Sequence, residues 1–143
     1  MRTIVIHEFP YDAMIFCCYL LVACMFGIVL ASAGFSDRLL HGEAVAIGMV
    51  LAFELSAQLG LCSLEDAARV QRHLASVGLP TSPTWIDGRD WQAARLIRHM
   101  SRDKKVTDGR IAFVLAKGIG RAFFPAHAEH DQISALLETA IAA

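Results

Sequence analysis

The sequence predicts a mainly α-helical domain with one small β-hairpin near residues 110–124. Three observations support this fold class. Apolar residues recur at helical spacing in several segments after residue 34, glycine and proline separate these segments, and the spacing changes to strand-like alternation at Ile111, Phe113 and Leu115. With 143 residues, the chain is long enough for one hydrophobic core and too short for two full domains.

The first predicted helix runs from Glu43 to Leu59 and is apolar on nearly every side. A helix of this kind is buried on all faces and therefore central in its domain. Several of its residues are small, which lets neighbouring elements approach closely: Ala44, Ala46, Gly48 and Ala52. Gly60 follows directly and is predicted to end the helix.

The second predicted helix begins after Ser63, which has Asp66 three residues on, the pattern of a capping box. Gly78 and Pro80 end the helix. Its predicted apolar stripe consists of Leu64, Ala67, Ala68, Val70, Leu74 and Val77.

The third predicted helix covers residues 89–106, with Trp91, Ala94, Leu96, Ile97 and Met100 on its buried side. The hairpin follows. Gly118-Ile119-Gly120 begins like a dinucleotide-binding loop, but Phe123 replaces the third glycine and no helix follows, so a hairpin turn is the better interpretation. Asp131 is predicted to cap a last helix that continues through Ile141.

Residues 1–33 form an atypical hydrophobic segment, which we separate from a helical domain at 34–143. Ala13 to Ala33 contains 21 residues and no charge, close to the ~20 residues of a membrane-spanning helix. Three interpretations stay open: a transmembrane anchor, a hydrophobic helix buried against a partner, and an N-terminus replaced by a disrupted reading frame. Hydropathy alone favours the first. A secretory signal is disfavoured because the only arginine before this segment is opposed by Glu8 and Asp12.

Charge and cysteine content exclude several classes of protein. A net charge of -1 gives no global indication of nucleic-acid binding. The four cysteines, Cys17, Cys18, Cys24 and Cys62, show no C-x-x-C spacing. A thiolate metal site and a disulfide framework are therefore disfavoured, and the cysteines are interpreted as small apolar residues.

Two places in the sequence carry side chains of the kinds that bind metals or anions. His41 and Glu43 lie at the start of the first helix, where a lone histidine is more often structural and a carboxylate suits the helix dipole. Lys104 and Lys105 belong to a basic run after the third helix. That run is either a solvated helix end or a pocket for a phosphate or carboxylate. The residue types alone do not decide between these alternatives.

A family resemblance connects the two places. "GFSDRLLHGEAVAIGMVLAFELSAQLGL", then "GLP", then "MSRDKKVTDGRIAFVLAKGIGRAF" closely resembles the C-terminal domain of 3-dehydroquinate synthase, from about Gly34 to the C-terminus. The resemblance implies the helical domain of the dehydroquinate-synthase-like fold. It also implies a cytoplasmic shikimate-pathway lyase, active in aromatic amino acid biosynthesis, that converts a heptulosonate 7-phosphate to 3-dehydroquinate and phosphate. The family uses NAD and a divalent metal, commonly zinc or cobalt, and forms dimers.

By position in the resembling motifs, His41 corresponds to a metal-ligand histidine that also borders the substrate. One of Lys104 and Lys105, with Lys104 preferred, corresponds to the lysine that meets the anionic substrate. No residue of this chain is assigned a catalytic or NAD-binding role. The family's other metal ligands are a glutamate near the domain junction and a histidine in an N-F-G-H-T-x-G-H-A-x-E-type block. Residues 14–33 stand where that block is expected and contain no histidine, asparagine, arginine or glutamate.

Neither the metal site nor the NAD site is therefore expected to be complete in this chain, which we predict to be an inactive C-terminal fragment when alone. Its expected ligand is a phosphorylated sugar acid, and nucleic acid is excluded. A homodimer or a chain that supplies the NAD domain is the expected protein partner. The alternative from a different class is a membrane-tethered or partner-binding helical module without catalysis, motivated by residues 13–33.

Overall fold

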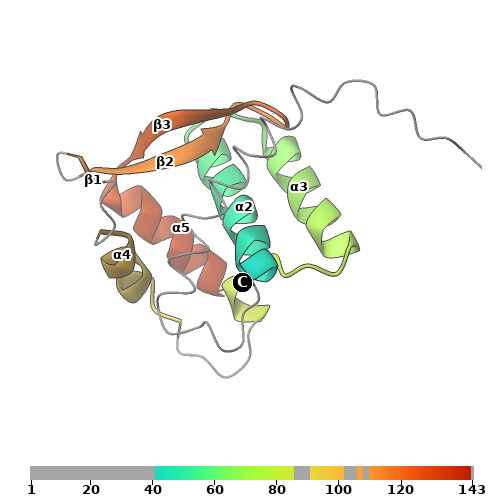
Figure 1. Cartoon of the computed structure of the whole chain (residues 1–143), viewed down its shortest axis with the longest axis horizontal. Helices are drawn as coiled ribbons and strands as arrows, with labels where there is room; N and C mark the ends of the chain where they lie inside the picture. Colours follow the sequence, from blue (N-terminus) through green and yellow to red (C-terminus); the bar gives the residue numbers. More distant parts are fainter. Residues whose placement is uncertain (1–40, 86–90, 102–105, 108–109, 143) are drawn as a thin grey trace, which may run out of the picture.

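The structure, a computed structural model, describes residues 41–85, 91–101, 106–107 and 110–142. Within these ranges it is mainly helical with a small antiparallel sheet, which confirms the predicted fold class (Figure 1). The elements in chain order are α2 His41–Gln58, α3 Leu64–Ser76, the short 3-10 helix η2 Pro83–Trp85, α4 Ala93–Ser101, β1 Val106–Thr107, β2 Arg110–Ala116, β3 Ala122–Ala128 and α5 His130–Ala142.

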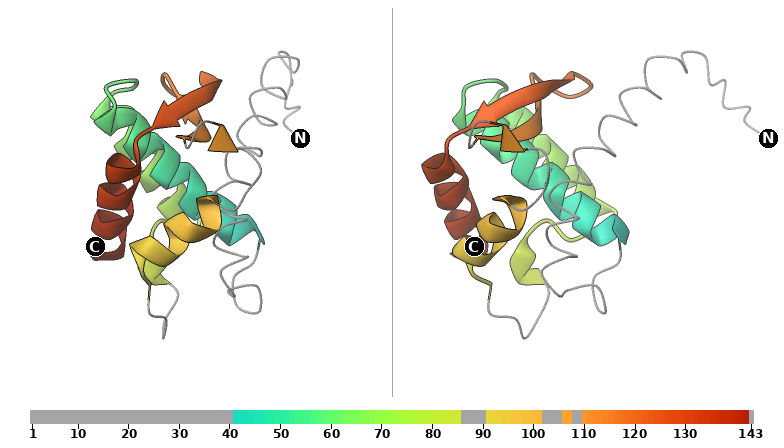
Figure 2. Two further views of the ribbon diagram at one scale, coloured as in Figure 1. Left: turned by 90° about the vertical axis from the view of Figure 1, so that its left-hand side faces the viewer. Right: turned by 60° about the vertical axis from the view of Figure 1, so that its left-hand side comes forward.

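Helix α2 is the central element of the domain, as its apolar sequence predicts. It lies between α3 and α5, and the sheet crosses one end of the helices (Figures 1 and 2). One side of α2 contributes Ile47, Leu51 and Leu55 to the main core, together with residues of α4, the sheet and α5. The opposite side packs on α3 through two smaller clusters, which contain Val50 and Phe53.

The predicted helix ends are confirmed at Gly60 and Gly78, both of which adopt positive φ, +70° and +80°. After α2, the backbone N–H of Leu61 donates to the Ser56 carbonyl and that of Gly60 to the Ala57 carbonyl. This pair of bonds satisfies carbonyls that the helix end leaves without partners, in a geometry that favours glycine. Ser63 is the N-cap of α3, because its Oγ accepts from the Asp66 N–H at 3.0 Å.

The hairpin is larger than the range 110–124 predicts. Strands β2 and β3 pair antiparallel from Ile111 opposite Ala128 to Ala116 opposite Ala122, and β1 adds a short third strand in the order β1-β2-β3. An irregularity in the register between Phe113 and Leu115 marks a bulge. Gly118 and Gly120 form the turn with φ of +141° and +76°. The interpretation of this glycine pair as a hairpin turn is confirmed.

Four details of the helix predictions are wrong. The third helix spans Ala93–Ser101 instead of 89–106, so Trp91 precedes it and Val106 belongs to β1. Within α4 the buried alanine is Ala93 and Ala94 is exposed, because residues 93, 96, 97 and 100 share one face at 3.6 residues per turn.

The other two errors concern helix ends. Leu64 and Val77 are 77% and 59% exposed, since they lie at the two ends of α3, past the part that packs on α2. Helix α5 is capped at Glu129 instead of Asp131, because the Gln132 side chain accepts from the Glu129 N–H at 3.0 Å. Asp131 lies in the first turn.

Candidate functional site

The residues predicted to carry chemistry lie at the edges of the described structure. His41 is the first residue of α2, and its backbone is the part that the structure describes. Lys104 and Lys105 lie outside the described residues, between the end of α4 at Ser101 and the start of β1 at Val106. Their roles as metal and substrate ligands therefore stay predictions.

The start of α2 matches the predicted arrangement of charge. Glu43 lies in the first turn, where the N-terminal end of the helix dipole favours a negative group. The side chain of Glu43 is half-buried. One residue on, Ala44 is 1% exposed, so the helix enters the core within its first turn.

One hydrophobic core joins the two segments that carry the predicted ligands. Ala44, three residues after His41, belongs to the main core cluster, and so does Met100 near the end of α4. The start of α2 and the end of α4, next to the predicted ligands, therefore both adjoin the same packed core. This is the closest relation between them that the described residues establish.

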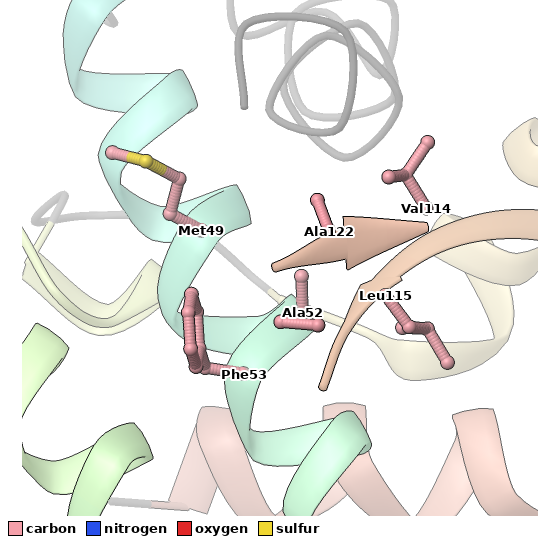
Figure 3. Close-up of a pocket in the computed structure, with 7 residues that line it drawn as sticks. Met49, Ala52, Phe53, Val114, Leu115 and Ala122 are labelled. Carbon is pink, nitrogen blue, oxygen red and sulfur yellow. The ribbon is translucent and has the colours of Figure 1, made fainter. Parts of the chain in front are cut away.

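The described part of the chain contains no complete metal site. Within residues 41–85, 91–101, 106–107 and 110–142, no group of three histidine, cysteine or acidic residues could hold a metal ion. The cavity between α2 and the hairpin (Figure 3) is apolar and has a volume of about 10 Å³, which holds about one water molecule. It is far too small for NAD or a sugar acid.

The hydrophobic segment predicted at 13–33 lies outside the described residues. In the part of the chain that is described, no helix is both long and apolar enough to cross a membrane. Cys17, Cys18 and Cys24 fall in the same undescribed segment.

Two titratable side chains of the described residues are perturbed by burial. Glu54 lies half-buried on α2, and desolvation raises the pKa of its carboxyl group above the ordinary value of 4.5. Burial, and secondly the charge of Asp66, raise the pKa of the Cys62 thiol, which donates to the Phe53 carbonyl at 3.7 Å. A raised thiol pKa lowers the thiolate fraction, so Cys62 suits the structural role predicted for it.

Sequence reasoning passed over Glu54 and Ser56, both on α2. Ser56 is fully buried; its Oγ donates to the Ala52 carbonyl at 2.6 Å and accepts from the Ala116 N–H at 3.0 Å. This is a structural link between α2 and β2. The sequence feature that points to Glu54 and Ser56 is their polarity inside an otherwise apolar helix.

Comparison with known proteins identifies the family. Residues 26–106 match the 3-dehydroquinate synthase C-terminal family. The chain belongs to this family. The match covers the start of α2 with His41 and continues past α4 to the beginning of β1.

The curated relatives are much longer than this chain. The 3-dehydroquinate synthase of Rhodospirillum rubrum is 51% identical over 113 residues, which are 78% of this chain and 29% of that protein. The 3-dehydroquinate synthase of Ruegeria pomeroyi is 52% identical over 112 residues, covering 78% and 30%. That of Paracoccus denitrificans is 60% identical over 99 residues, covering 68% and 27%. The chain thus spans about 30% of the length of the curated relatives it matches.

Solved structures agree with the fold. A 2-deoxy-scyllo-inosose synthase complexed with carbaglucose-6-phosphate, NAD+ and Co2+ superposes with a TM-score of 0.69 at 16% identity, over 83% of this chain and 34% of that chain. The 2-epi-5-epi-valiolone synthase of Streptomyces hygroscopicus, with NAD+ and Zn2+ bound, gives 0.68 at 27% identity, over 82% and 31%. The first likeness shows the fold alone.

Proposed function

We propose that this chain contributes the helical C-terminal domain of a 3-dehydroquinate synthase, the lyase that converts a heptulosonate 7-phosphate to 3-dehydroquinate and phosphate. The observation that carries the proposal is the family match over residues 26–106. Relatives named 3-dehydroquinate synthase that are 51–60% identical over most of the chain support it. By this assignment the chain acts in the cytoplasm, in the shikimate pathway.

In this proposal His41 is one metal ligand beside the substrate, and Lys104 or Lys105 binds an anionic group of the substrate. A lysine ammonium attracts phosphate or carboxylate as a compact positive charge. The packing gives support: His41 lies three residues before Ala44, Lys104 lies four residues after Met100, and Ala44 and Met100 share one core. A rigid core between two ligand-bearing segments is what a preorganised site requires.

The described residues do not fit a metal or NAD by themselves. A catalytic zinc site needs three protein ligands, and the described part offers no group of that kind. The cavity of about 10 Å³ between α2 and the hairpin is too small for a dinucleotide. The solved structures with this fold contain NAD+ with Co2+ or Zn2+. We therefore infer that activity requires metal ligands and an NAD-binding domain from outside the described residues, and that a chain carrying the NAD domain can supply them.

Phosphate release tests the proposal. The purified chain, supplied with NAD, Zn2+ or Co2+ and the heptulosonate phosphate, is expected to release no phosphate above background. Addition of a chain that carries the NAD domain and the missing glutamate and histidine ligands is expected to start phosphate release and to raise the metal content of the complex to one ion per site.

The matched variants are His41→Ala and His73→Ala. His73 is an exposed histidine on α3, so its replacement removes an imidazole of the same kind at no predicted site. His41→Ala is expected to abolish both metal retention and phosphate release in the mixed complex, and His73→Ala to leave both unchanged. Turnover by the isolated chain, or equal loss in the two variants, would overturn the proposal.

A further inference from the structure

The helix α4 and the residues that follow it in the sequence carry an excess of positive charge. Between residues 95 and 110 there are six lysines and arginines and two aspartates, whereas the whole chain has 13 lysines and arginines and 14 acidic residues. The rest of the chain is therefore net acidic. A basic region on such a chain produces a local positive potential, which attracts anions.

Two arginines of this region lie on the described surface of α4. Arg95 and Arg98 are exposed, and the helix, residues 93–101, contains no acidic residue. The opposite face of α4 is buried in the main core through Leu96 and Met100, and the helix packs beside α5 (Figures 1 and 2). Residues three apart in a helix are neighbours on its surface, so the packed core presents the two arginines together.

The helix dipole does not explain both arginines. A cation near the C-terminal end of a helix is stabilised, and Arg98 lies in the last turn of α4. Arg95, however, is the third residue of α4, where the positive end of the dipole disfavours a cation. The helices α2, α3 and α5 each carry an acidic residue in the first turn, and α4 carries none. The charge of Arg95 therefore opposes the local stability of α4 and calls for an interaction beyond the helix itself.

Chain connectivity keeps the arginines near the predicted substrate lysines. Lys104 follows Ser101, the last residue of α4, by three positions. Three residues span at most roughly 11 Å, and Arg98 precedes Ser101 by roughly 5 Å along the helix axis. The Cα atoms of Arg98 and Lys104 are therefore at most roughly 16 Å apart. This separation is within the Debye length of about 30 Å at 0.01 M salt, so both charges act on one anion.

We propose that Arg95 and Arg98 attract the anionic substrate toward the lysine at 104 or 105. The inference rests on the proposed function, because it takes the heptulosonate 7-phosphate as the ligand. The phosphate of that substrate is an anion, and a basic surface beside a binding site raises the local concentration of an anionic ligand. The two arginines are not catalytic residues. They act at a distance on substrate binding and leave the chemical step unchanged.

The KM for phosphate release in the mixed complex, measured at two ionic strengths, tests the proposal. At about 0.01 M salt, Arg98→Gln is expected to raise KM about twofold, the effect of one charge on a doubly charged phosphate roughly 15 Å away in water. The value of kcat should not change. Arg98→Glu should raise KM about fourfold, since it reverses the charge, and Arg98→Lys should keep the parent value. At about 0.15 M salt the differences should shrink, because the Debye length falls to about 8 Å.

Arg69→Gln is the matched control. Arg69 is an exposed arginine of α3, so its replacement removes the same charge from a helix surface. Helix α3 packs on the side of α2 that faces away from α4 and the main core. The KM of this variant is therefore expected to equal that of the parent at both ionic strengths. Circular dichroism checks that each variant is folded.

A titration of the full chain alone with inorganic phosphate separates this inference from the proposed function. At about 0.01 M salt, phosphate is expected to shift the NMR signals of the α4 amides, and Arg98→Gln but not Arg69→Gln should remove the shifts. If the mixed complex releases no phosphate, the proposed function fails, and the titration still decides whether α4 attracts anions. Three results would overturn the inference: α4 signals that do not respond to phosphate, equal KM for the Arg98→Gln and Arg69→Gln variants at low salt, and a change in urea stability alone, which indicates a helix-dipole role.

Discussion

The hydroxyl of Ser56 joins the central helix to the sheet, and its removal is predicted to destabilise the domain. Ser56 is 0% exposed, and the Ala116 N–H at the end of β2 donates to its Oγ at 3.0 Å. Ser56→Ala deletes that acceptor in a place that water cannot reach. The Ala52 carbonyl, which accepts from Oγ at 2.6 Å, keeps its helical partner.

The expected magnitude follows from two opposing terms. A buried N–H without an acceptor costs about 1–3 kcal/mol, while alanine is favoured over serine inside a helix by roughly 0.5 kcal/mol. The free energy of unfolding should therefore fall by about 1–2 kcal/mol. Urea denaturation followed by circular dichroism measures the change, and hydrogen exchange of the Ala116 amide should accelerate.

The matched control is Ser76→Ala at the end of α3. Ser76 also donates to a backbone carbonyl of its own helix, that of His73 at 2.7 Å, but it is exposed and accepts no bond from another of the described elements. Its replacement should change stability by less than about 0.5 kcal/mol. If Ser56→Ala were as stable as the parent, with unchanged exchange at Ala116, the link between α2 and β2 would have no energetic role and the reasoning would fail.

Three further predictions concern stability. Ile47→Ala in the main core, where Ile47 is 0% exposed, should cost about 2–5 kcal/mol in urea denaturation, whereas Leu64→Ala at a 77% exposed position should cost little. Ser63→Ala removes the N-cap bond to the Asp66 N–H and should lower the unfolding free energy by about 0.5–2 kcal/mol; an unchanged urea midpoint would contradict this. Because burial raises the pKa of Glu54, the folded state binds more protons than the unfolded state above pH 4.5, and stability falls as pH rises through the interval up to the folded pKa. Glu54→Gln should therefore be more stable than the parent at neutral pH and equal to it below pH 4.5.

The helical part of the fold could be predicted because local chemistry determines it. The apolar run of α2, the N-cap at Ser63 and the helix-ending glycines at 60 and 78 act over a few residues, and the structure contains each of them. The errors arise where tertiary context decides. Leu64 and Val77 have helical spacing, but no neighbour among the described elements extends far enough to cover the ends of α3.

The strand boundaries depended on pairing that sequence alone does not reveal. The end of β3 at Ala128 follows from its partner Ile111, and the bulge between Phe113 and Leu115 breaks the simple alternation. The candidate site was accessible only through the family motif. A lone histidine at a helix start and two lysines after a helix have ordinary structural explanations, and only their combined occurrence with the surrounding motifs indicates a site.

Folding and chemistry can be measured separately in this chain. The main cluster, as the described residues define it, is built from residues between Ala44 and Leu137. If the chain unfolds cooperatively in urea but releases no phosphate, the domain is folded and the lack of activity is due to missing ligands. If the isolated chain showed no cooperative transition, the domain would need its partner to fold, and complementation would have to restore structure and activity together.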